Sequence, residues 1–181
     1  MEKADFAELR IMLLSGKTHG AQTLRSVLTL AGISRILTVD QSVRAIDLLT
    51  MEHFDAVYAA DACDQVEGLT FPLAVRRKRG ILNPMIPIFV FHEQARRCNV
   101  EAARDTGATD FITCPVSPKT VMAKLEAALL SPRPFIKAPD FFGPDRRAKA
   151  RPVWNGEDRR TLAPRKVQLQ KGELPPGSTL I

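Results

Sequence analysis

Short apolar runs separated by polar turns mark the first 130 residues of the chain. Five of these runs are five or six residues long and rich in branched aliphatic or aromatic side chains, which is typical of strands. The predicted strands cover residues 9–14, 35–39, 55–60, 86–91 and 109–113. Because most of these runs are apolar throughout rather than alternating with polar residues, we expect both faces of the resulting sheet to be covered.

Segments with helical spacing of apolar residues follow each strand. The predicted helices cover residues 19–31, a segment that begins at Ser42, and residues 68–79, roughly 93–105 and 117–130. Strands that alternate with helices predict a parallel sheet, because parallel strands need long crossover connections. We therefore expect an α/β fold, a five-stranded parallel doubly wound (βα)5 sheet. Sites in such sheets lie at the carboxyl ends of the strands, here residues 15–16, 40, 60–61, 91–93 and 113–115.

The composition changes after residue 130. Residues 131–181 carry 11 basic and 5 acidic side chains, which accounts for the whole net charge of +6 of the 181-residue chain. The same segment holds 8 of the 13 prolines. A composition of this kind disfavours a packed core. We expect one domain over residues 1–130 and a mostly irregular, Pro/Arg-rich basic tail over residues 131–181 that is extended or disordered.

The chain carries no targeting or membrane signal that we can identify. Its start is polar and acidic, unlike a signal peptide, and no apolar run approaches the ~20 residues that span a bilayer. Cys63, Cys98 and Cys114 fit neither a C-x-x-C motif nor an even disulfide framework. We expect reduced thiols, a cytoplasmic location and no membrane insertion.

Two stretches of the first domain resemble a response-regulator receiver (CheY-like) domain. Residues 102–117 are similar to the receiver pattern A-G-A-x-D-[FY]-[LI]-x-K-P, and residues 54–60 with the later Glu67-Gly68-Leu69 resemble the third strand and its loop. The resemblance covers residues 8–130 and implies bacterial two-component or phosphorelay signal transduction. In receivers, a phosphoryl group is transferred onto an aspartate, an acidic cluster holds Mg²⁺, and a Lys and a Thr or Ser contact the phosphoryl group.

The positions that carry this chemistry in a receiver hold other residue types here. The resemblance places the metal-binding acidic pair on Ser15 and Gly16, the phosphoacceptor on Ala60, the Thr/Ser on His92, the Lys on Cys114 and the switch aromatic on Phe111. Mg²⁺ prefers carboxylate ligands, and alanine cannot form an acyl phosphate. Without the lysine, nothing neutralises the phosphoryl oxygens. We expect a degenerate pseudo-receiver that is not an enzyme and needs no metal or cofactor.

Two alternatives remain at these positions. Asp61 could act as a shifted phosphoacceptor, which would make the chain an unconventional phospho-receiver. However, one residue along a strand reverses the direction of the side chain, and the metal pocket would still be missing, so we do not expect Asp61 to accept phosphate. His92 and Cys114, at adjacent strand ends, could form a nucleophile–base pair or half of a metal site, but the sequence shows no orienting acid.

The basic tail contains a short repeat. Residues 142–147 and 155–160 share Gly and Asp-Arg-Arg at an offset of 13 residues, and Arg pairs bind phosphates and carboxylates bidentately. The Arg-x₃-Arg spacing within the tail resembles cyclic-di-GMP readers of the PilZ type, although their [DN]-x-S-x-x-G element is absent. The candidate ligand- or partner-binding residues are Arg146, Arg147, Arg151, Arg159 and Arg160.

The leading hypothesis is a non-catalytic signalling adaptor that binds a protein partner. The receiver resemblance implies a partner surface around the fourth helix, fifth strand and fifth helix. The alternative is a cyclic-di-GMP effector that uses the tail arginines. Sequence-specific nucleic-acid binding is not expected, because no recognition-helix motif is present. The sequence leaves the oligomeric state open.

The basic residues 76–79 at the end of a predicted helix are interpreted as partners of its dipole.

Overall fold

Five parallel strands form the main sheet of the protein. A computed structural model describes residues 6–15, 19–60, 65–92, 103, 105–113, 115–138, 141–145 and 165–167. The strands are β1 (Arg10–Leu14), β2 (Arg35–Val39), β3 (Ala56–Ala60), β4 (Ile88–His92) and β5 (Asp110–Thr113), in the order β2-β1-β3-β4-β5. The predicted five-stranded parallel sheet is confirmed, and the strand bounds differ from the prediction by at most two residues.

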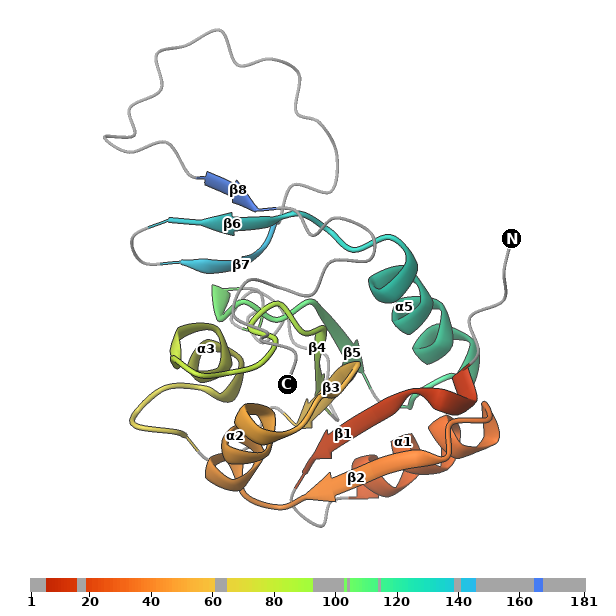
Figure 1. Ribbon diagram of the computed structural model, residues 1–181. Coiled ribbons are helices and arrows are strands. Elements are labelled where there is room, and N and C mark those ends of the chain that lie inside the picture. The colour runs from red at the N-terminus through yellow and green to blue at the C-terminus, as the bar shows by residue number, and fades with distance from the viewer. Residues whose placement is uncertain are drawn as a thin grey trace, which may run out of the picture.

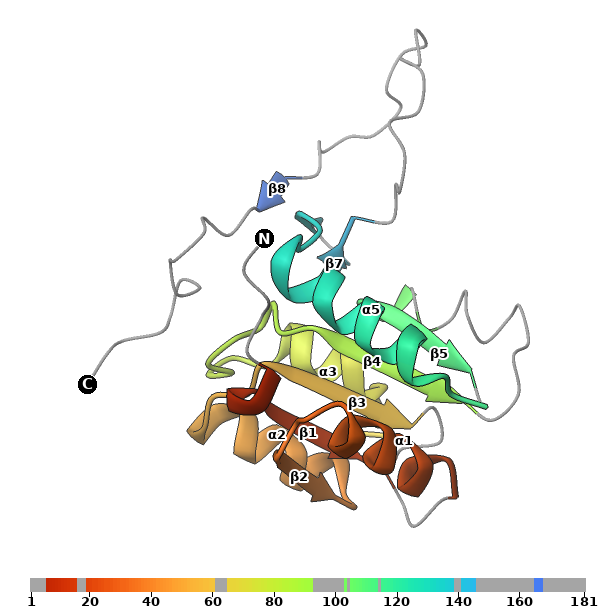
Figure 2. The ribbon, with the colours of Figure 1, turned by 90° about the vertical axis from the view of Figure 1, so that its right-hand side faces the viewer.

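Helices cover both faces of this sheet. They are α1 (His19–Leu30), α2 (Ser42–Met51), α3 (Phe71–Arg77) and α5 (Pro118–Leu130), with a short 3-10 helix η1 (Phe6–Glu8) before β1. Figure 1 shows α2 and α3 on one side of the sheet and α1 and α5 on the other, and Figure 2 gives the view at right angles. The helix predicted over residues 93–105 lies mostly outside the described residues.

The third helix is shorter than predicted because a turn precedes it. Val66 and Leu69 exchange backbone hydrogen bonds of 2.8 and 2.9 Å. Between them Glu67 and Gly68 have φ values of 53° and 77°, which an α-helix does not allow. The helix therefore begins only at Phe71, with Pro72 in its first turn, where proline is well tolerated.

The hydrophobic core has two layers separated by the sheet. Along β1, Ile11 and Leu13 pack with α1 and α5, while Met12 and Leu14 pack with α2 and α3. Successive strand residues point to opposite faces, so a strand that is apolar at every position serves both layers. This explains why β1 carries no alternating pattern and why its last four residues are buried.

The described parts of the basic tail contain three short strands. These are β6 (Phe135–Lys137), β7 (Phe142–Pro144) and β8 (Arg165–Val167), which form an antiparallel sheet in the order β7-β6-β8. Figure 1 shows them together, apart from the main sheet and near the end of α5. The sequence did not predict these strands. Most of the tail lies outside the described residues, so its extended or disordered character there stays a prediction.

The β6–β7 hairpin packs on the domain where the loop before β5 approaches it. An added Cβ on Gly143 would lie only 2.8 Å from the Cα of Gly107. Gly107 has a φ of +85°, and a Cβ there would meet the carbonyl oxygen of Phe142 at 2.9 Å. The two glycines therefore allow two backbones to approach more closely than any other residue pair would.

One residue of the basic cluster at the end of α3 is buried, which the sequence did not predict. Arg76 is only 5% exposed, whereas residues 77–79 are exposed. Its guanidinium donates hydrogen bonds to the carbonyl oxygens of Gly107 (3.1 Å), Pro84 (2.7 Å) and Ile86 (2.8 Å). A planar guanidinium suits such an arrangement because its five N–H groups point outward in fixed directions. Arg76 lies in the last turn of α3, as predicted, and its buried guanidinium also connects the helix to the loops before β4 and β5.

Candidate functional site

The carboxyl edge of the main sheet is where the sequence places the candidate site. Ser15 directly follows β1 and is buried, and its backbone N–H donates to the carbonyl oxygen of Val39 at the end of β2 (3.0 Å). Ala60 is the last residue of β3 and is half-buried. Leu14 pairs in register with Ala59, so Ser15 and Ala60 follow a matched pair on adjacent parallel strands. The structure therefore brings these two predicted positions to the same part of the edge.

The other half of the edge is formed by β4 and β5. His92 ends β4, is half-buried, and pairs in register with Thr113, the last residue of β5. Gly16, Asp61 and Cys114 lie outside the described residues. The pairing of His92 with Cys114 and the role of Asp61 therefore stay predictions.

The described residues of this edge do not suit a magnesium ion. Ser15 offers a hydroxyl group, Ala60 a methyl group and His92 an imidazole, whereas Mg²⁺ prefers carboxylate oxygens. Asp40, which is exposed after β2, is the one carboxylate among the strand-end residues that the structure describes. Within the described part of the chain, no group of three or more His, Cys, Asp or Glu side chains gathers in a way that could hold a metal ion.

Phe111, where the receiver resemblance places the switch aromatic, lies in the core. It is 8% exposed and packs with Val90, Ala103 and Ala108 in a small cluster of its own. Its neighbours in this cluster come from β4 and from the segment that leads into β5. The ring therefore contributes to packing between β4, β5 and the preceding helical segment, and its role as a switch stays a prediction.

Below the edge, β3 places a tyrosine inside the core. Tyr58 is fully buried and its ring stacks on Phe89, with ring centroids 4.8 Å apart. Its hydroxyl group has no hydrogen-bond partner among the described residues. Burial raises the pKa of the Tyr58 phenol well above its usual value, because the phenolate would be poorly solvated there.

The five candidate tail arginines (Arg146, Arg147, Arg151, Arg159 and Arg160) all lie outside the described residues. Their proposed ligand- or partner-binding role is therefore untested by the geometry. Sequence reasoning did miss two features that the structure shows: the buried Arg76 and a cavity between α5 and the β6–β7 hairpin. The available signal was Phe135, an aromatic residue in a Pro- and Arg-rich segment, which packs against the domain instead of staying in solvent.

Among the described helices, none combines the length and apolar character needed to cross a membrane.

The fold matches solved receiver structures over about two thirds of the chain. A response regulator from Chloroflexus aurantiacus matches with a TM-score of 0.59 at 20% identity, covering 68% of this chain and 99% of that one. A response regulator from Desulfuromonas acetoxidans gives 0.59 at 19% identity, with 67% and 97% covered. The receiver domain of a sensor histidine kinase from Pseudomonas aeruginosa, solved with magnesium in its active-site cleft, gives 0.57 at 18%, with 68% and 99% covered.

No protein-family model matches the sequence, and no curated protein matches it either. Because the sequence identity to these structures is low, the likeness establishes the fold alone. The predicted fold is confirmed: the described five-stranded parallel sheet and its flanking helices have the flavodoxin-like fold of response-regulator receiver domains.

Proposed function

We propose that this protein is a non-catalytic pseudo-receiver that acts in two-component or phosphorelay signalling by binding a protein partner. The observation that carries the proposal is Ala60 at the end of β3, where the receiver resemblance places the phosphoacceptor. Its methyl group cannot accept a phosphoryl group. Ser15 and His92, at the ends of β1 and β4, supply none of the carboxylates that a receiver uses to hold Mg²⁺.

The partner surface that we propose consists of the fourth helix, β5 and α5, as the receiver resemblance implies. Of these elements, the structure describes β5 and α5 in full. Parts of α5 are accessible: Leu130 is 52% exposed, and Ala123 and Ala127 are exposed as well. These positions leave the helix accessible to another protein.

Regulation of such a module would not depend on phosphorylation. Its activity would instead follow its abundance, its location or the binding of a ligand. We propose that the basic tail is a second binding element that becomes ordered on its partner, as expected for a charged, proline-rich segment.

The proposal is tested by incubating the full-length protein with acetyl phosphate and Mg²⁺ and measuring the intact mass. The receiver domain of the Pseudomonas aeruginosa histidine kinase serves as the matched control, because it was solved with magnesium in its cleft. We expect the control to gain a phosphoryl group and this protein to gain none. Amide NMR spectra of this protein should also be unchanged by Mg²⁺.

The Asp61→Ala variant separates the alternatives. Labelling of the natural protein that is lost in this variant would establish the unconventional phospho-receiver and overturn the proposal. Labelling that survives in the variant would exclude Asp61 as the acceptor but would still show that the chain is phosphorylated.

A further inference from the structure

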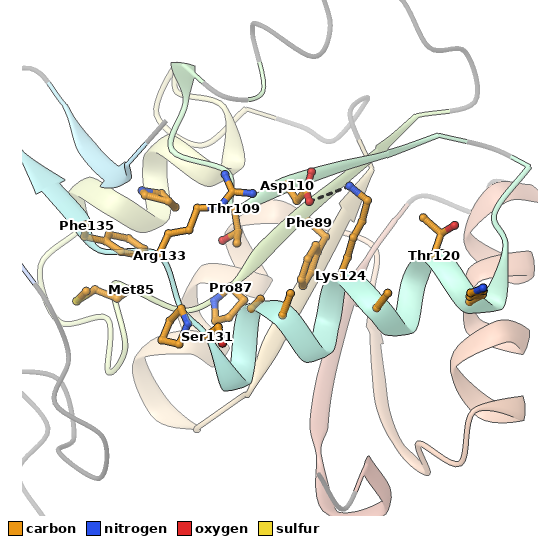
Figure 3. Close-up of a pocket in the computed structure, with 16 residues that line it drawn as sticks. Met85, Pro87, Phe89, Thr109, Asp110, Thr120, Lys124, Ser131, Arg133 and Phe135 are labelled. Carbon is orange, nitrogen blue, oxygen red and sulfur yellow. Dashed lines mark ion pairs between the residues drawn. The ribbon is translucent and has the colours of Figure 1, made fainter. Parts of the chain in front are cut away.

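A cavity of about 440 Å³ lies between α5, the starts of β4 and β5, and the β6–β7 hairpin (Figure 3). Three of its lining side chains, Met85, Phe89 and Phe135, are almost fully buried, so the cavity has a fixed apolar wall. Its volume lies in the range of roughly 300–1,000 Å³ that is usual for small-molecule sites. The hairpin is essential to its shape, since Phe135 and Pro144 belong to β6 and β7.

The charged side chains around this cavity are mostly basic. Lys119, Lys124 and Arg133 line it, against one acid among the described residues, Asp110. Lys124 and Asp110 are already paired, with Nζ 2.8 Å from Oδ2, and Figure 3 shows this pair in the middle of the cavity. Lys119 and Arg133 are exposed and have no ion-pair partner among the described residues. A ligand that enters the cavity therefore meets uncompensated positive charge.

A hydroxyl donor lies at the hairpin end of the cavity. Thr109 Oγ1 accepts a hydrogen bond from the backbone N–H of Ile88 (3.0 Å), which leaves its own O–H able to donate. In Figure 3, Thr109 and Arg133 are both found toward the end where Phe135 lies. An anionic group that leaves water needs donors of this kind, and charge-assisted hydrogen bonds from guanidinium groups are among the strongest.

We propose that this cavity binds a small amphipathic organic anion. Its carboxylate, sulfonate or phosphate group would be held by Arg133 and Thr109, and its apolar body would pack against Met85, Phe89 and Phe135. Because the walls come from both the domain and the hairpin, the ligand binds only when the hairpin is docked. Because the ligand binds only the docked state, it must shift the equilibrium between docked and undocked hairpin toward the docked state. The position of the tail then depends on the concentration of a small molecule.

The first test uses 8-anilinonaphthalene-1-sulfonate, a fluorescent probe with an aromatic body and one sulfonate. Its matched control is N-phenyl-1-naphthylamine, which has the same aromatic body and no charge. We expect saturable binding of one sulfonate probe per full-length chain, at least roughly 10-fold tighter than binding of the neutral probe, because the anion gains charge-assisted hydrogen bonds. Equal affinity for the two probes would overturn the anion requirement.

Substitutions of charged residues test whether the sulfonate probe binds in this cavity. Removing a cation and removing an acid should change its affinity in opposite directions. Arg133→Gln removes a cation and should weaken sulfonate binding several-fold. Asp110→Asn removes the one acid found in the described lining of the cavity and releases Lys124 from its ion pair, so it should strengthen binding. Lys78→Gln is the matched control, because Lys78 is also exposed and does not belong to the described lining of the cavity. Equal weakening by Arg133→Gln and Lys78→Gln would contradict the proposal.

Filling the cavity gives a third, independent result. Ala127 lines the cavity from α5, and Ala127→Phe should abolish binding of the sulfonate probe. Thr29→Phe adds the same ring to an exposed position of α1 and should leave binding unchanged. Unchanged binding to Ala127→Phe would place the probe elsewhere. Circular dichroism will show whether Ala127→Phe folds. If it does not, the opposite effects expected of Arg133→Gln and Asp110→Asn still show whether the probe binds in the cavity. A loosened core would bind the probe irrespective of these charges.

Discussion

The guanidinium carbon of Arg76 lies 5.1 Å from the centre of the Phe135 ring. This contact joins the end of α3 to the first strand of the tail, 59 positions later in the chain. The Phe135 ring also lies 5.4 Å from the ring of Phe142 on β7. Because the same guanidinium donates to carbonyl oxygens of the loops before β4 and β5, Arg76 ties the hairpin to the domain interior.

Replacing this arginine should destabilise the protein strongly. Arg76→Met keeps much of the side-chain volume but leaves three carbonyl oxygens without their donor, and buried polar groups without partners are costly. We expect a loss of about 3–5 kcal/mol in the free energy of unfolding, measured by urea denaturation. Arg76→Lys should be intermediate, because an ammonium group lacks the planar fork. Arg79→Met, at an exposed position, should change the free energy by less than about 0.5 kcal/mol.

The contribution of Arg76 to the free energy of unfolding should not change with pH in the neutral range. Burial lowers the pKa of Arg76 to about 9, since desolvation disfavours the cation. The folded-state pKa then lies below the unfolded one but still above the neutral range, so the residue is charged in both states and binds the same number of protons near pH 7. A stability difference between the natural protein and Arg76→Met that varies between pH 6 and pH 7.5 would contradict this assignment.

The difference between prediction and structure at Arg76 has a physical cause. Apolar periodicity identifies the strands and helices, because each element must bury one face or both. This periodicity was sufficient to predict the sheet and the edge that holds the candidate site. A run of four basic residues carries no such period, so nothing in it distinguishes the one side chain that turns inward. That distinction depends on Gly107 and Pro84, whose carbonyl groups reach Arg76 only in the folded chain.

The tail strands were missed for a related reason. Each is three residues long, and Pro144 lies within β7. Such segments carry too little pattern to suggest a strand, and proline usually argues against one. Contacts with Arg76 and Gly107 hold β6 and β7 instead, and β8 pairs with β6. The proposal about Ser15 and Ala60, in contrast, could be made from sequence alone, because it depends only on the residue types at positions that the receiver resemblance assigns.

The close approach of Gly143 to Gly107 predicts that even one methyl group will disturb the hairpin. In Gly143→Ala, the new Cβ would lie 2.8 Å from both the Cα of Gly107 and the ring of Phe141, so backbone or ring must move. We expect a loss of about 1–3 kcal/mol in the free energy of unfolding, as for other overpacked sites. Lys137→Ala, on the exposed side of β6, is the control and should change little. A Gly143→Ala protein as stable as the control would show that the hairpin does not pack here.

Tyr58 offers a direct measurement of burial, because it is the only tyrosine in the chain. Burial raises the pKa of its phenol, so the folded state keeps the proton at a pH where the unfolded state loses it. Stability should therefore fall as the pH rises above about 10, the ordinary pKa of tyrosine. In an alkaline titration, the ultraviolet absorbance of tyrosinate should appear together with unfolding. A phenolate signal from the folded protein at its ordinary pKa would show that Tyr58 reaches solvent.

The same residue predicts a stabilising substitution. The Tyr58 hydroxyl has no partner among the described residues, and an unsatisfied buried hydroxyl is unfavourable. Tyr58→Phe keeps the ring that stacks on Phe89 and removes only this group. We expect the free energy of unfolding to rise by about 1 kcal/mol in urea denaturation. A clear loss of stability would mean that the hydroxyl is hydrogen-bonded in solution.

The cyclic-di-GMP alternative predicts saturable binding that depends on the tail arginines. An NMR titration of the full-length protein with cyclic-di-GMP should then shift the tail resonances at low ligand concentration. The test variant replaces four arginines by alanine: Arg146, Arg147, Arg159 and Arg160. Its control removes the same charge from four lysines of the tail: Lys137, Lys149, Lys166 and Lys171.

An arginine pair can bind phosphate bidentately and stack on a base, whereas lysine acts mainly as a point charge. Loss of binding in the arginine variant alone would therefore establish a second-messenger effector. Equal loss in both variants would indicate nonspecific attraction to a basic segment, which salt would also abolish. No shift of the natural protein at high ligand concentration would remove this alternative and leave protein binding as the function of the tail.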